Sequence, residues 1–129
     1  MTEQEFKTKA TEIIKQIVDN IADKEYEKLA SFSQIDSSWV EPGQTQEDAF
    51  LAFGEWLDEQ LAMWEEDEER IFAIDHFDES CLEDIKFEED GSFVTYNPTN
   101  SGDELDLWFE IDLKVDKNEQ ILATFNVNS

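Results

Sequence analysis

Basic residues, cysteine, glycine and proline are all scarce in this chain of 129 residues. Nine Lys and Arg stand against 34 Asp and Glu, which gives a formal net charge of −25. Such a field repels nucleic-acid phosphate and anionic membrane surfaces, and it attracts cations and basic proteins. The composition therefore disfavours nucleic acid and membrane as partners and favours a basic protein.

The single cysteine, Cys81, excludes an intrachain disulfide and a zinc site built from cysteines. The first residues lack the basic and apolar regions of a signal peptide, and no apolar run approaches the ~20 residues of a membrane span. We therefore expect a cytoplasmic protein, since an unpaired thiol suits a reducing compartment. Four Gly and two Pro leave little room for linkers, so we predict one domain over residues 1–129.

The acidic excess lies almost entirely after residue 30. Residues 1–30 hold seven acids and five bases, which leaves 27 of the 34 acids and four of the nine bases for the rest. Ten Phe, four Trp and two Tyr at periodic positions argue against a disordered acidic chain. We expect a folded core whose middle and C-terminal parts carry the acidic surface.

Helical periodicity dominates the first half, and we expect helices within residues 3–66. The first apolar stripe starts at Phe6, behind a capping pattern of Thr2 and Glu5. Asp23 can cap a second, shorter helix, and Thr45 with Asp48 can cap a third. A short strand near Trp39 is expected between them. The third helix should fray in the acidic run 65–69, because negative charge opposes the C-terminal end of a helix dipole.

The apolar period changes to two after residue 70, which predicts antiparallel strands over residues 70–128. Residues 71–74 are typical of a short buried strand or of an extension of the third helix. Residues 83–88 and 93–96 indicate a hairpin around Asp90-Gly91. The strongest alternation runs from Leu105 to Val115, and a last strand covers residues 121–127. Helices followed by strands indicate an α+β fold with the N-terminal helices on one face of a curved antiparallel sheet.

This order of elements resembles the NTF2-like/cystatin-like group, and within it the small bacterial immunity-type domains. The resemblance extends from the first helix through Asp23–Leu29, the Trp39 segment and the third helix to the strands, and it rests on pattern rather than on a diagnostic motif. It implies a toxin-neutralising protein. An enzyme of this group would instead use a pair such as Asp75 and His76 inside an enclosed pocket.

The sequence offers no catalytic residue set, no cofactor motif and no metal-ligating spacing, so we expect no enzyme, no cofactor and no structured metal site. Trp108 lies on the polar face of the strongest strand among carboxylates, which is typical of an interface anchor with a charged rim. We therefore predict partner-binding residues at Asp106, Trp108, Glu110 and Asp112.

Four functions follow from these observations. The leading one is an immunity protein that neutralises a basic toxin, such as a nuclease, by stoichiometric binding. A nucleic-acid mimic would share the charge but would need two long rows of carboxylates. An NTF2-like enzyme would need the pocket, and a homodimeric structural domain would use the Trp108 face as a subunit interface.

Overall fold

Helix α1 (Glu3–Ala22) forms where the apolar stripe predicts it. The Thr2 side chain accepts a hydrogen bond from the backbone N–H of Glu5, which satisfies one of the free donors at the helix start. The stripe is buried along its whole length, from Phe6 to Ile21. Asp23 does not cap a second helix: its backbone N–H closes the last turn of α1 on the carbonyl of Asp19.

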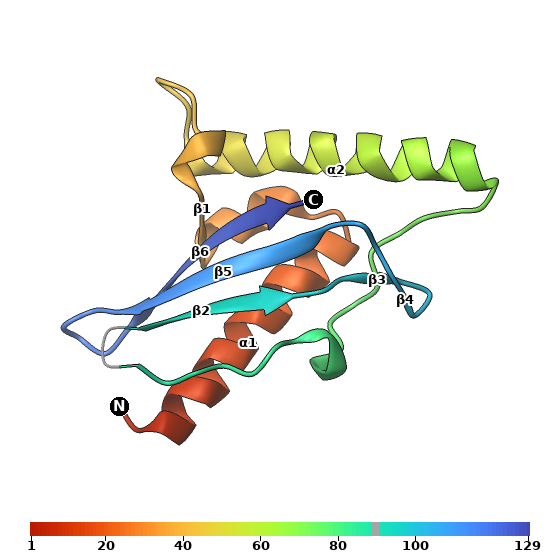
Figure 1. The fold of residues 1–129 in the computed structure, drawn as a ribbon. Coiled ribbons are helices and arrows are strands. Elements are labelled where there is room, and N and C mark those ends of the chain that lie inside the picture. The colour runs from red at the N-terminus through yellow and green to blue at the C-terminus, as the bar shows by residue number, and fades with distance from the viewer. Residues whose placement is uncertain (89–90) are drawn as a thin grey trace.

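The computed structural model describes residues 1–88 and 91–129 and shows an α+β fold (Figure 1). Short 3₁₀ helices at Tyr26–Ser31 (η1), Ser37–Trp39 (η2) and Glu79–Cys81 (η3) join the larger elements. Within the described residues, no helix combines the length and the apolar character needed to cross a membrane.

Helix α2 (Gln46–Glu68) begins with the predicted capping box, in which Thr45 and Asp48 each accept a hydrogen bond from the other's backbone N–H. The predicted fraying at residues 65–69 is wrong, because the helix continues through Glu68 and Glu69 ends it in the left-handed conformation. The acids in this last part of α2 lie along the helix surface. Solvent therefore screens their repulsion with the helix dipole.

The main sheet has four strands in the order β1-β6-β5-β2. Their bounds are Gln34–Ile35 (β1), Gly91–Tyr96 (β2), Trp108–Val115 (β5) and Ile121–Asn128 (β6). β2, β5 and β6 are antiparallel, as predicted, whereas β1 pairs parallel with β6. The sheet is therefore mixed, and its parallel edge strand lies in the segment between the two helices. The strand expected near Trp39 forms earlier, at β1, because Trp39 itself belongs to the 3₁₀ helix η2.

The antiparallel strands start later than the predicted residue 70, at Gly91 of β2. Within residues 70–88 only Leu82 makes an isolated bridge, to Tyr96, and the chain is otherwise extended coil or the 3₁₀ turn η3. Phe72 and Ile74 are buried as a strand pattern predicts. The Ala73 N–H, however, donates its hydrogen bond to the side-chain oxygen of Asn100 and not to a neighbouring strand. Asp90 of the predicted Asp90-Gly91 turn lies outside the described residues.

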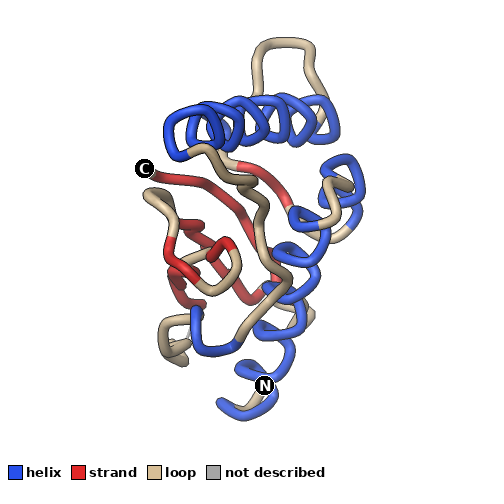
Figure 2. The backbone as a smooth tube through the Cα atoms, turned by 90° about the vertical axis from the view of Figure 1, so that its right-hand side faces the viewer, coloured by secondary structure: helices blue, strands red, loops and turns tan. Residues whose placement is uncertain are grey.

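A small ribbon of β3 (Thr99–Asn100) and β4 (Asp103–Glu104) stands apart from the main sheet. Both helices lie on one side of the main sheet, with α2 crossing above the β1 edge (Figures 1 and 2). Phe50 and Phe53 of α2 contact Phe125 of β6, with ring centroids 6.4 and 5.0 Å away. Within residues 1–88 and 91–129, no helix covers the opposite face of the sheet (Figures 1 and 2).

Alkaline pH should destabilise the protein through Tyr96, which is buried against Phe77 and Phe109. Burial raises the pKa of Tyr96 to about 12, from an ordinary value of about 10. Since the folded pKa is the higher one, the stability that the neutral Tyr96 hydroxyl contributes is intact below about pH 10 and is lost as pH rises from there towards 12, by roughly 3 kcal/mol at most.

Urea unfolding of wild type and Tyr96→Phe across this pH range measures the effect. The variant should lose about 1 kcal/mol at neutral pH, because the Tyr96 hydroxyl accepts the Asp78 N–H at 3.0 Å. Its stability should then fall less steeply above about pH 10. Parallel pH curves for the two proteins would contradict the assignment to Tyr96.

Candidate functional site

The two faces of β5 differ sharply in burial. Phe109, Ile111 and Leu113 point towards the helices and are fully buried. Trp108, Glu110 and Asp112 alternate with them on the other face, where Trp108 remains 37% exposed. Because side chains alternate along a strand, the helix-covered face holds the core and the opposite face meets solvent. We call the latter the outer sheet face.

The outer sheet face continues over the strands on both sides of β5. Phe93 of β2 and Thr124 of β6 both lie opposite Asp112, and Asn126 of β6 lies opposite Glu110. Directly opposed residues have their Cβ atoms about 4.5–5.5 Å apart, so these side chains form one surface. Phe93 is 62% exposed, so the outer sheet face carries this exposed ring in addition to that of Trp108.

A depression of about 280 Å³ crosses the outer sheet face. We call it the sheet trough, and its lining residues are Asp36, Phe93, Glu110, Asp112, Thr124 and Asn126. Asp36 arrives from β1, because parallel pairing sets Ile35 beside Phe125 and the Asp36 N–H donates to the Phe125 carbonyl at 2.8 Å. The trough thus draws on all four strands of the main sheet or on residues adjoining them.

The Asp36 carboxylate is held ionised. Hydrogen bonds from the hydroxyl and the backbone N–H of Ser38, at 2.6 and 3.1 Å, lower the pKa of Asp36 below its usual range. Both bonds reach the same oxygen, Oδ2. The trough therefore keeps this negative charge at any pH near neutrality.

The two carboxylates of β5 differ in their neighbours. The indole N–H of Trp108 donates to Glu110 at 3.0 Å, so the exposed ring orients this carboxylate. Asp112 lies 4.0 Å from the ammonium of Lys114, two residues along the strand, and both side chains are exposed. An exposed pair at this distance contributes little, so Asp112 can exchange Lys114 for a partner's cation at small cost.

Three of the four predicted residues share one surface. Trp108, Glu110 and Asp112 lie together on the outer sheet face, whereas Asp106 is exposed in the bend before β5 and lies outside the ladder. Sequence reasoning missed Phe93 and Asp36. The alternation in β2 could have revealed Phe93, since Val94 and Tyr96 occupy the buried face. No sequence signal places Asp36, next to β6, in the same trough as Glu110 and Asp112 of β5.

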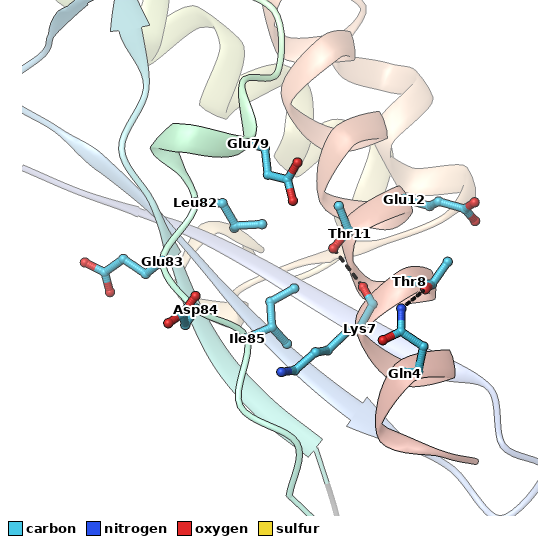
Figure 3. A pocket seen from close by; sticks show the side chains of 10 residues that line it. All are labelled: Gln4, Lys7, Thr8, Thr11, Glu12, Glu79, Leu82, Glu83, Asp84 and Ile85. Atoms are coloured by element: carbon cyan, nitrogen blue, oxygen red, sulfur yellow. Dashed lines mark hydrogen bonds between the residues drawn. The ribbon is translucent and has the colours of Figure 1, made fainter.

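A larger depression, of about 520 Å³, lies between α1 and residues 79–85 (Figure 3). Leu82 and Ile85 form its apolar part, and Lys7 extends across it from α1. Its lining residues, all in the described part of the chain, include no aromatic ring. It therefore offers no counterpart to the exposed rings of the outer sheet face, and we treat that face as the candidate site.

Asp75 and His76 have separate hydrogen-bond partners in this structure. The Asp75 carboxylate accepts hydrogen bonds from the Thr99 hydroxyl and from the N–H groups of Ser101 and Gly102, so it holds the turn between β3 and β4. His76 instead contacts Asp23 at 2.7 Å, and its side chain is 66% exposed. An acid–base pair in an enclosed pocket requires a different arrangement.

Cys81 is half-buried in η3. Among residues 1–88 and 91–129, no group of three or more His, Cys, Asp or Glu side chains is arranged to hold a metal ion.

Comparisons with protein-family models, with curated proteins and with solved structures find no match to this chain.

Proposed function

We propose that this chain is a stoichiometric binding protein that blocks a basic partner through its outer sheet face, and that it serves as an immunity protein against a toxin. One observation carries the proposal: a sheet face without a covering helix presents exposed Trp108 and Phe93 around Glu110 and Asp112. Aromatic anchors supply most of the binding energy in such interfaces, and surrounding charges speed the encounter.

Charge favours a basic partner over a second copy of this chain. A two-fold symmetric dimer through the outer sheet face would bring the same surface patch of both copies together. The carboxylates of Asp36, Glu110 and Asp112 would then oppose one another, with Lys114 as the nearby base. Like charges across an interface cost several kcal/mol, whereas lysines and arginines of a nuclease would offset the same carboxylates.

A nucleic-acid mimic is less well supported. Such a mimic would present carboxylates in two long rows at phosphate spacing. The sheet trough instead gathers three carboxylates at one place and adds the aromatic ring of Phe93. This arrangement suits one projecting basic group of a protein better than a groove that normally follows a nucleic-acid backbone.

Binding to a basic toxin domain, to be sought among the genes that neighbour this one, tests the proposal. Raising the ionic strength from about 0.01 M to about 0.15 M shortens the Debye length from about 30 Å to about 8 Å, so association should slow by tenfold or more, as measured by stopped flow. Trp108→Ala should cost at least about 2 kcal/mol, roughly a 30-fold loss of affinity by titration calorimetry, and should act mainly on dissociation.

The matched control is Glu55→Gln/Glu59→Gln on the exposed side of α2. It removes the same charge as Glu110→Gln/Asp112→Asn but leaves the outer sheet face intact. The sheet variant should slow association clearly more than the control. Equal effects would show that net charge alone drives the encounter, and association independent of salt would contradict electrostatic capture altogether.

A further inference from the structure

We infer that the partner presents an arginine, and that its guanidinium lies in the sheet trough against the ring of Phe93. This inference rests on the proposed function and names the chemistry of the partner at that site. We assign arginine because the size of the trough, its charge and its aromatic wall each restrict what can bind there.

Size is the first restriction. At about 280 Å³ the trough lies below the usual range of small-molecule pockets, which is about 300–1,000 Å³. It is also open along the outer sheet face, as expected of a surface that a larger partner covers. A single long side chain projecting from a docked protein matches these dimensions better than a free ligand does.

Charge is the second restriction. Asp36 borders the trough from the β1 side, and Glu110 and Asp112 border it from β5. The hydrogen bonds from Ser38 occupy only one oxygen of Asp36, and Trp108 donates to one oxygen of Glu110. Each carboxylate therefore keeps an oxygen for a further donor, and a guanidinium carries five N–H donors in one plane.

The aromatic wall separates arginine from lysine. Phe93 lies directly across from Asp112 and is the most exposed aromatic ring of the outer sheet face. A guanidinium stacks on an aromatic face and is weakly hydrated, whereas an ammonium is compact and strongly hydrated. Arg70 already packs in this way within the chain, with its Cζ 4.7 Å from the ring centroid of Phe72. A planar cation can thus contact the ring and the carboxylates together.

NMR titration with N-acetyl-arginine methylamide tests the inference without a protein partner. We expect saturable shift changes at the amides of Phe93, Glu110, Asp112 and Thr124. Affinity should exceed that of N-acetyl-lysine methylamide by about two- to five-fold, the range of an exposed cation–π contact. Phe93→Leu should bring the two probes to equal affinity, while Glu110→Gln/Asp112→Asn should weaken both.

Phe87→Leu is the matched control, because Phe87 is also partly exposed but packs on Phe6 of α1, away from the trough. It should leave the preference for arginine unchanged. Shifts spread evenly over the acidic surface, or equal affinity for both probes in the wild type, would overturn the inference.

The outcomes separate this inference from the proposed function. If a basic protein binds through the outer sheet face but the arginine probe produces no localised shifts, the arginine assignment fails and the function stands. If the probe binds in the trough but no basic protein does, the trough recognises arginine and the proposed function fails.

Discussion

Replacing Phe53 with Ala should remove about 3–5 kcal/mol from the free energy of unfolding. Phe53 of α2 is fully buried, and it joins both 3₁₀ helices before α2 to the inner face of the sheet. Five rings surround it, those of Tyr26, Trp39, Trp56, Phe109 and Phe125. The loss combines the lost burial of the ring with a cavity that these neighbours cannot fill. The total free energy of unfolding of a domain of this size is about 5–15 kcal/mol. A mild concentration of denaturant should therefore unfold most of the variant.

Urea unfolding followed by tryptophan fluorescence measures this loss. Phe93→Ala on the outer sheet face is the matched control, since it removes the same atoms from a ring that is 62% exposed. It should cost about 1 kcal/mol or less. Similar losses for the two variants would mean that the outer sheet face is buried in solution, which would also contradict its role as a free docking surface.

Gly54→Ala should destabilise the protein by about 1–3 kcal/mol, although alanine is the better helix former by about 1 kcal/mol. Gly54 is buried in α2 directly beneath the ring of Tyr26, and an added Cβ would lie 2.2 Å from the ring atom Cδ2. The Tyr26 ring is not free to move aside, because its hydroxyl donates a hydrogen bond to Asp58 at 3.0 Å and the ring packs in a T-shaped contact with Phe53. Overpacking should therefore outweigh the gain in helix propensity.

A double-mutant cycle identifies the cause of the Gly54 effect. In a Tyr26→Ala background the ring is gone, so Gly54→Ala should become stabilising by about 1 kcal/mol. The change of sign is the diagnostic result, and denaturation midpoints at constant m-value provide it. Additive losses in the cycle would show that contacts other than Tyr26 restrict position 54.

These two positions connect the core to the candidate site. Phe53 and Gly54 hold α2 and η1 against the helix side of the sheet, and this packing keeps α2 on the same face as α1 (Figure 1). The outer sheet face stays open as a consequence. Its exposed rings and carboxylates are thus available for binding because of aromatic packing on the opposite side.

Local patterns predicted much of this arrangement. The stripe from Phe6 to Ile21 and the capping box at Thr45 are confirmed, since helical period and caps act within a few residues of each other. The alternation in β5 and β6 is confirmed for the same reason. It also predicted correctly that Trp108, Glu110 and Asp112 share a face opposite the core.

Predictions that needed a distant partner were less successful. Residues 71–74 and 83–88 alternate like strands, and Phe72, Ile74 and Ile85 are buried as alternation predicts. They nevertheless form no ladder. In the first segment the Asn100 side chain bonds the Ala73 N–H and the Ile71 carbonyl, and the second reaches β2 only near its start, through the Leu82–Tyr96 bridge and the Glu83 N–H that donates to the Thr95 carbonyl. Phe87 instead contacts Phe6 of α1, which draws this segment towards the helix rather than along β2. Burial and strand pairing are separate properties, and alternation reports only burial.

Composition and short-range patterns account for the strong acidic charge, the amphipathic faces of α1, β5 and β6, and the position of Trp108 among carboxylates. Each of these depends on residue content or on residues only a few positions apart. The parallel pairing of β1 with β6, which places Asp36 in one trough with Glu110 and Asp112, and the position of Phe93 across from Asp112 follow from long-range packing. Those neighbours depend on which distant segments pair when the chain closes around its core, and local periodicity carries no information about that choice.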